Sequence, residues 1–188
     1  MKKILFILFL ISNITLFAQK DCEYSDNIKD SLGTFKATKD YLMSEKNFGK
    51  KSDFIYFHLA NTDGMPTLVV QIINKNNGFV KAKCFDKQSR LFIQLTNQKI
   101  IPLVYLGNDT CGTSILDKKF DNVRVISGNF GFPKGSLEEL KKLSFSFMRI
   151  KFATEKEDFI IKNGLKSEMD SFYYDSSNFF INYLKCIE

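Results

Sequence analysis

The sequence predicts a mainly β protein: one antiparallel β-sandwich, immunoglobulin-like or an open barrel, with a short helix near residues 137–143 and an amphipathic C-terminal helix. Short apolar runs alternate with polar residues, and turn-forming residues separate them roughly every eight to twelve positions. Four cysteines form an even set, and an apolar N-terminal segment has the pattern of an export signal. Together these observations predict an exported, disulfide-containing β domain.

Residues 1–18 have the pattern of a bacterial signal peptide. Two lysines precede an apolar stretch from Ile4 to Ala18, which three polar residues interrupt. This stretch is shorter than the roughly 20 apolar residues that span a bilayer, and its length suits a signal peptide. Ala18 is a small residue of the kind that precedes cleavage, so residues 19–188 are the predicted mature domain. We expect it to be periplasmic or extracellular, with no membrane span after cleavage.

The charge pattern argues against nucleic acid as a partner. The formal charge is +6, and removing Lys2 and Lys3 with the signal leaves +4. The lysines are scattered among acidic residues, whereas nucleic-acid binding needs a clustered basic stripe. The densest group, Lys81 to Lys87, alternates with apolar residues and predicts the solvent-facing side of a strand. An overall charge of this size gives only a weak, unspecific attraction to an anionic envelope surface.

The four cysteines predict two disulfides, because thiols oxidise in exported proteins. Four cysteines allow three pairings, and sequence alone does not choose among them. We favour Cys22–Cys186, which would join the two ends of the domain, and Cys84–Cys111, which would join a strand to a nearby loop. A zinc site is disfavoured because no C-x-x-C is present and zinc ligands normally come in closely spaced pairs.

The first half of the chain contains the clearest strand signals. The segment before Gly33 is polar and predicts a loop. Strands are predicted at 34–43, 53–60, 66–73, 79–85, 90–96 and 99–106. Asn61-Thr62-Asp63-Gly64 and Asn97-Gln98 supply turn residues, so two hairpins are expected. Pro102 lacks an N–H to donate, which places an edge or a bulge at that position.

The second half mixes loops, strands and two helices. Residues 107–114 form the most loop-like stretch and contain Cys111, and a strand is predicted around 123–126. Ser136-Leu137-Glu138-Glu139 has the spacing of a capping box and predicts the first helix. Residues 144–153 then predict a strand with Phe145, Phe147, Arg149 and Lys151 on one face, and 159–162 a short partner.

The C-terminal residues predict a helix that packs on the domain. Apolar residues from Phe172 to Ile187 recur at helical spacing, and Asp175 or Ser176 is suited to cap a helix ending near Cys186. Such a stripe is more often a packing face than a binding face. The chain also contains 20 Phe and no Trp, which is typical of an aromatic core rather than a sugar-stacking surface.

No catalytic, cofactor-binding or metal-binding residue is predicted. His58 is the only imidazole, and its place within a predicted strand favours a surface or hydrogen-bonded residue over a Cys–His or Ser–His mechanism. The sequence lacks a G-x-S-x-G motif, a phosphate-binding loop and a D-x-D-x-D-G calcium loop. A pair of carboxylates that meet only in the folded protein stays possible, and sequence favours no particular pair.

Two features resemble small exported proteins of Bacteroidota bacteria. The signal ends in Phe-Ala-Gln, within a chain rich in Lys, Asn and Phe. The segment SLEELKKLSFSFMRIKFATEKEDFII resembles a module of uncharacterised proteins of that group, in which a short helix precedes a strand carrying an Arg-Ile pair, here Arg149-Ile150. The resemblance implies no activity.

We therefore expect a non-catalytic exported protein that binds an envelope protein or polymer. The expectation rests on the class of fold, which commonly presents loops and edges for binding. One alternative is a hydrolase that acts on envelope glycan or peptide through a carboxylate pair. Another is an inhibitor or immunity protein for a secreted toxin.

Overall fold

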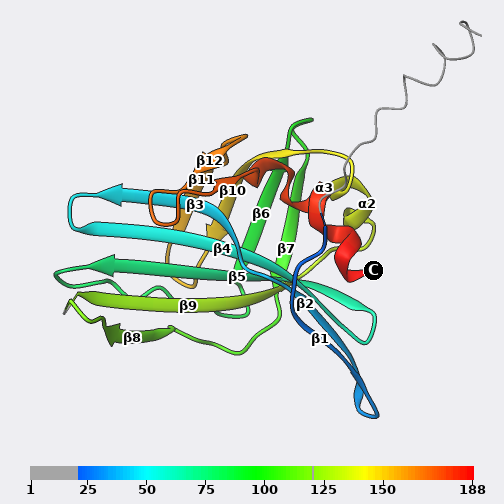
Figure 1. The fold of residues 1–188 in the computed structure, drawn as a ribbon, viewed down its shortest axis with the longest axis horizontal. Coiled ribbons are helices and arrows are strands. Elements are labelled where there is room, and N and C mark those ends of the chain that lie inside the picture. Colours follow the sequence, from blue (N-terminus) through cyan, green and yellow to red (C-terminus); the bar gives the residue numbers. More distant parts are fainter. Residues whose placement is uncertain (1–20, 120) are drawn as a thin grey trace, which may run out of the picture.

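The computed structural model describes residues 21–119 and 121–188, and the predicted signal peptide lies outside them. Figure 1 shows two layers of antiparallel strands whose directions cross steeply. The strand order in the larger sheet is β1-β2-β4-β5-β9-β7-β6-β10-β11, with β3 added to β4 and β8 added to β9. The sheet is therefore continuous but open, and the predicted fold class is confirmed. In the described residues, no helix is both long and apolar enough to cross a membrane.

One layer is built on long strands. It contains β3 (Tyr41–Phe48), β4 (Lys51–Thr62), β5 (Met65–Asn76), β8 (Thr113–Leu116) and β9 (Asn122–Gly131), and the hairpin of β1 (Tyr24–Asp30) and β2 (Gly33–Thr38) extends it. The second layer contains β6 (Arg90–Leu95), β7 (Ile100–Tyr105), β10 (Phe145–Lys151) and β11 (Lys156–Ile160). The layers join where β7 pairs with the end of β9, through Tyr105 and Phe130. Such a corner is typical of orthogonal sheet packing.

Alternation of side chains explains why the long strands form. In β4, Ile55, Phe57 and Leu59 are buried, and the residues between them are more exposed. Strands β5, β6 and β7 follow the same alternation. Because successive strand residues point to opposite faces, each strand contributes one apolar side to the space between the layers. Pro102 of β7 faces β6 alone, since β9 pairs with β7 only from Val104 onward. The predicted edge position of this proline is confirmed.

Helices cover one end of the sandwich. They are α2 (Ser136–Leu140), α3 (Phe179–Tyr183) and two 3-10 turns, η1 (Ser176–Asn178) and η2 (Leu184–Ile187). A two-stranded sheet of β12 (Leu165–Lys166) and β13 (Tyr173–Tyr174) precedes η1 in the chain. Phe179 and Phe180 are buried in the core, where Phe180 meets the rings of Phe57 and Phe145. The C-terminal stripe is a packing face, as predicted, although its helix is broken into three short pieces.

The polar segment before Gly33 is a strand rather than the predicted loop. Residues of β1 pair with β2 from Tyr24 to Asp30, yet nearly all of them are exposed. Because both faces of this strand are exposed to water, its sequence does not alternate between apolar and polar residues, and the pattern used to predict strands is absent. Likewise, the predicted strand 34–43 is divided between β2 and β3.

The predicted strand at 79–85 is also wrong. This segment makes only one isolated bridge, between Phe85 and Thr110. Phe85 is fully buried, whereas Ala82 on the predicted inner face is exposed. Lys81 and Lys83 pair with Glu155 and Glu157 instead of forming the solvent-facing side of a strand. The segment is therefore held by side-chain contacts and by a disulfide rather than by a backbone ladder.

Two local predictions around α2 need correction. Gly135, in a left-handed conformation, is the N-cap residue of α2, so Ser136 lies inside the helix and donates to Pro133 O. No capping box forms, and Glu139 pairs with Lys99 instead. In β10, the register shifts between Phe145 and Phe147. Because a bulge reverses the alternation, Phe145 is buried and does not share the outer face with Phe147.

Candidate functional site

A groove lies on the open side of the sandwich, between the long-stranded layer and the edge strand β11. Three adjoining hollows of about 310, 320 and 320 Å³ form it. The first and second share Lys46 and Asp158, and the second and third share several residues, including Asp53, Lys83 and Glu157. The hollows therefore form one elongated depression rather than separate pockets.

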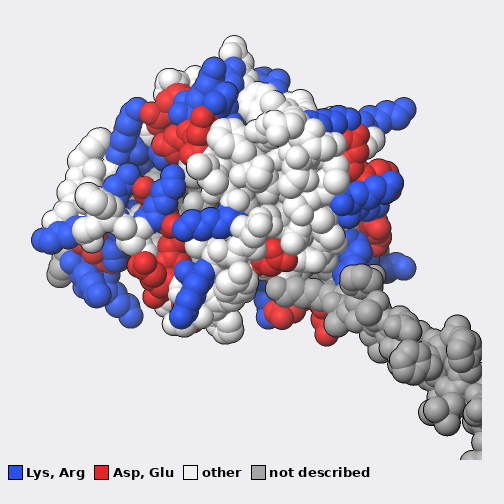
Figure 2. All heavy atoms as spheres, turned by 90° about the horizontal axis from the view of Figure 1, so that it is seen from above, with Lys and Arg blue, Asp and Glu red and all other residues white. Residues whose placement is uncertain are grey.

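Charged residues dominate the lining of this groove. Lys51 pairs with Asp53 at 2.9 Å, Lys83 with Glu157 at 2.7 Å and Lys81 with Glu155 at 2.5 Å. Figure 2 shows Lys, Arg, Asp and Glu crowded together at the end of the molecule formed by the β3–β4, β5 and β8–β9 connections, beside a broad uncharged surface. Each of these pairs except Lys51–Asp53 joins segments more than seventy residues apart in the sequence.

The floor of the groove is apolar where the two layers approach. Ile55, Ile72 and Phe159 line the central hollow and are buried. The Lys46 ammonium group crosses from β3 and lies 4.7 Å from the centre of the Phe159 ring. A cation over a ring face is attracted by the ring quadrupole. Lys46 is exposed overall, so its flexible side chain can move when a ligand enters the groove.

The outer edge of β11 presents unpaired backbone groups to this groove. The Ile161 N–H donates to Ser146 O, and the Phe152 N–H donates to Glu155 O. In an antiparallel ladder the hydrogen-bonded pairs alternate, so β11 bonds to β10 through Glu157 and Phe159. The N–H and C=O groups of Lys156, Asp158 and Ile160 consequently point away from β10. No hydrogen bond to these outward groups is present in residues 21–119 and 121–188.

One carboxylate on β11 is held ionised beside the groove. Arg149 lies directly opposite Asp158 on β10 and donates to both of its oxygens, at 2.6 and 2.7 Å. This bidentate contact lowers the pKa of Asp158 below its ordinary value. Such an arrangement favours charge recognition, since a general acid needs a raised pKa near neutral pH.

The predicted cysteines form the two favoured disulfides. Cys22 bonds to Cys186, and Cys84 bonds to Cys111. The first joins the start of the sheet to η2, and the second fixes the 79–85 segment next to the groove. Two disulfides are typical of proteins outside the cytoplasm.

His58 lies on the outer face of β4, away from the groove. Its Nδ1 is 2.8 Å from Asp40 Oδ1, which fits the predicted hydrogen-bonded surface residue. Within the described part of the chain, no group of three or more His, Cys, Asp or Glu side chains is placed to hold a metal ion.

A second hollow of about 360 Å³ lies beside the C-terminal helix and is lined by aromatic rings. Tyr41 contacts the rings of Tyr174, Phe179 and Tyr183 at 5.1 to 5.5 Å between centroids. Burial raises the pKa of Tyr183 to about 12. Burial, together with the Asp170 carboxylate, raises that of Tyr174. These phenols stay protonated, and their rings pack mainly on one another. We therefore infer that the cluster stabilises the fold rather than binding a ligand.

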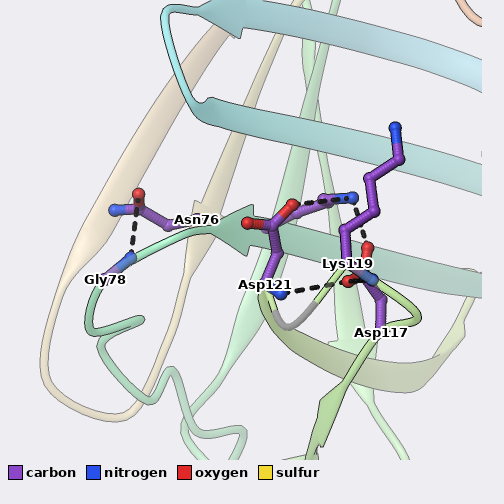
Figure 3. A network of polar contacts seen from close by, with 6 residues as sticks. Asn76, Gly78, Asp117, Lys119 and Asp121 are labelled. Atoms are coloured by element: carbon purple, nitrogen blue, oxygen red, sulfur yellow. Dashed lines mark hydrogen bonds and ion pairs between the residues drawn. The ribbon is translucent and has the colours of Figure 1, made fainter.

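An ion-pair network of Asp117 and Asp121 with Lys75, a lining residue of the third hollow, lies beside one end of the groove (Figure 3). The Lys75 ammonium group binds the Asp117 carboxylate and lies 3.2 Å from Asp121 Oδ2. Asp117 also accepts hydrogen bonds from the backbone N–H groups of Lys119 and Asp121. These contacts lower the pKa of Asp117 from 3.8 to about 2, and the hydrogen bond from Lys75 has the largest effect.

This network predicts a pH dependence of stability. The folded-state pKa of Asp117 lies below its ordinary value, so its ionised form stabilises the fold above pH 3.8, and this contribution is lost as the pH falls towards about 2. Asp117→Asn should therefore lose less stability than the wild type over this interval. Urea midpoints measured at stepped pH test this. Lys75→Met should also make the urea midpoint less dependent on pH over this interval. If its midpoints fall with pH as steeply as those of the wild type, the interpretation is wrong.

The geometry defines the class of protein: an open, two-layer antiparallel β protein with a charged groove beside an unpaired strand edge. Comparison with protein-family models, with curated proteins and with solved structures finds no match for this chain.

Proposed function

We propose that this is a non-catalytic exported binding protein, and that its groove takes an extended, acidic segment of another polypeptide. The observation that carries the proposal is the free edge of β11, which lies along an elongated depression. An extended chain that adds to a sheet edge gains main-chain hydrogen bonds, and flanking hollows then select its alternate side chains.

The chemistry of the groove favours an acidic ligand. Four of its acidic residues have cationic partners, namely Asp53, Glu155, Glu157 and Asp158. The fifth, Glu45, accepts hydrogen bonds from Asn47 and from the backbone N–H of Glu168. By contrast, Lys46, Lys156 and Lys162 flank the edge, and none of them has an ion pair in the described residues. A segment carrying Asp or Glu would supply the missing countercharges. Lys and charged neighbours on an edge also discourage this chain from pairing with itself.

Binding to a peptide array tests the proposal. The probes are short synthetic peptides of alternating apolar and charged residues, in matched sets carrying Glu, Lys or Gln at the charged positions. The labelled protein should prefer the Glu set, and the preference should weaken with salt. Equal binding to all three sets would contradict the predicted selectivity.

A proline variant tests the edge directly. Ile160→Pro removes an N–H that points away from β10, so it deletes a donor to the ligand without breaking the β10–β11 ladder. We expect about tenfold weaker binding of the best Glu peptide, because a ligand carbonyl loses its partner. Ile160→Ser is the matched control, since it changes the side chain and keeps the N–H. Equal affinities of the two variants would show that the edge is not used.

The two alternative functions give different results in the same experiments. A hydrolase acting on envelope glycan or peptide would cleave an array probe or an envelope polymer. An inhibitor or immunity protein would bind one toxin through an interface that Ile160→Pro need not affect. Neither alternative has a specific observation in its favour comparable with the free edge of β11.

Export from a Bacteroidota bacterium, to the periplasm or the medium, is part of the proposal.

A further inference from the structure

Five strands of the long layer end in one straight row. Phe48 pairs with Lys51, Lys51 with Asn76, Asn76 with Asn122, and Asn122 with Leu116. The connections that follow these residues therefore project from the same edge of the molecule, at the left of Figure 1. We call this edge the rim. With neighbouring strands about 4.8 Å apart, the rim spans roughly 19 Å from β3 to β8.

Among the described residues, large apolar side chains are exposed at each of the three connections on the rim. Phe48 is 88% exposed, Phe79 is 85% exposed and Leu116 is 62% exposed. Asn122 Nδ2 donates to Gly78 O, which ties the Phe79 loop to the row. The three side chains are spread over separate tips, and none of them fills a hollow shared with the others. A partner must meet them along a broad front rather than in a pocket.

Lysines accompany the apolar tips. Lys50, Lys118 and Lys119 are exposed, and no ion pair involves their side chains in the described ranges 21–119 and 121–188. The two aspartates at the rim, Asp117 and Asp121, are both held by Lys75. Lys51, a residue of the row itself, is paired with Asp53. With this pair included, five lysines and three aspartates give the described part of the rim a net charge of +2.

We propose that the rim docks on an anionic lipid surface. Apolar side chains at separate tips enter the boundary between headgroups and acyl chains, and the lysines beside them meet anionic headgroups. The mixture of exposed Phe with unpaired Lys matches both regions of such a surface. This contact leaves the free edge of β11 open, because β11 belongs to the second layer. Phe79 and Lys51 of the rim also line the third hollow of the groove, so only that end of the groove would face the lipid.

Vesicle co-sedimentation of the processed protein tests the proposal. The probes are vesicles of phosphatidylcholine alone and of an equal mixture of phosphatidylcholine and phosphatidylglycerol. We expect binding to the mixed vesicles that falls as salt rises. The double variant Phe48→Ser with Phe79→Ser should bind about tenfold or more weakly, since two apolar anchors are lost. The triple variant Lys50→Gln, Lys118→Gln, Lys119→Gln should weaken binding about a hundredfold, because each lysine contributes about fivefold.

Leu32→Ser is the matched control. Leu32 is 92% exposed at the β1–β2 turn, outside the row of paired residues that defines the rim. This variant should bind mixed vesicles like the wild type, and Ile160→Pro should do so as well. No binding to mixed vesicles at low salt would overturn the proposal. Equal loss in Leu32→Ser and in the double Phe variant would also overturn it, because general adhesiveness would then explain the binding.

Discussion

Replacing both Cys22 and Cys186 with alanine should lower the free energy of unfolding by about 5 kcal/mol on the chain-entropy model. The expected loss is large because the bond joins residues 164 positions apart. A cross-link over so long a loop removes much of the entropy of the unfolded chain. In the folded protein, the Tyr24 hydroxyl also donates to Cys186 O at 2.9 Å. Without the disulfide, this hydrogen bond is held less firmly, which adds to the loss. Urea unfolding of the oxidised proteins measures the effect.

The second disulfide provides the comparison. Cys84 and Cys111 are separated by only 27 residues, so the double alanine variant should lose about 3.5 kcal/mol on the same model. Each double variant removes two sulfur atoms, so the difference between them reports mainly on loop length. A larger loss at Cys84–Cys111 than at Cys22–Cys186 would contradict the chain-entropy explanation and indicate that local packing dominates.

Phe85→Ala should destabilise the protein by about 3–5 kcal/mol, the usual range for removing a buried ring. Phe85 is fully buried, and its ring stacks on Phe152 with 5.2 Å between centroids. It also meets Phe130 edge-on at 5.5 Å and Tyr105 at 5.3 Å. The loss should be seen as a lower urea midpoint in equilibrium unfolding.

Phe79→Ala is the control for this prediction. It lies six residues earlier on the same segment and is 85% exposed, so its replacement should change stability by no more than about 0.5 kcal/mol. If both variants are destabilised equally, the segment rather than the ring of Phe85 is responsible. If Phe79→Ala is stable but binds mixed vesicles more weakly than the wild type, unfolding does not explain its loss of binding.

The sequence predicts those parts of the fold that are amphipathic and local. The β4–β5 hairpin follows from alternating apolar residues on both sides of a turn at Asp63 and Gly64, and the structure has that turn. The C-terminal packing stripe follows from its helical spacing. The predicted strand at 79–85 failed because its alternation places Val80, Ala82 and Cys84 inward. In the fold, the fully buried residue of this segment is Phe85, and long-range contacts hold it in place.

The groove was not predictable from the sequence. Its residues come from three stretches, 43–55, 72–83 and 155–165. Only the pairing of β3, β4 and β5, together with the approach of β11 from the second layer, brings them together. Lysines and acids scattered along a chain look alike whether they line a groove or coat a surface. The free edge of β11 is equally hidden, because whether a strand is central or at an edge depends on the order of all strands in the sheet.

The C-terminal segment constrains when this protein can mature. Phe179 and Phe180 fill the middle of the core, and Asn61 on β4 donates to Ile187 O at 2.5 Å. The Cys22–Cys186 disulfide cannot form until Cys186, 164 residues later in the chain, has been synthesised. Strands that emerge early therefore lack part of their core until the last residues are available, and contacts of long sequence separation slow folding. A chain threaded through a membrane from its N-terminus would stay incompletely folded until its tail arrived, which suits transport in an extended form.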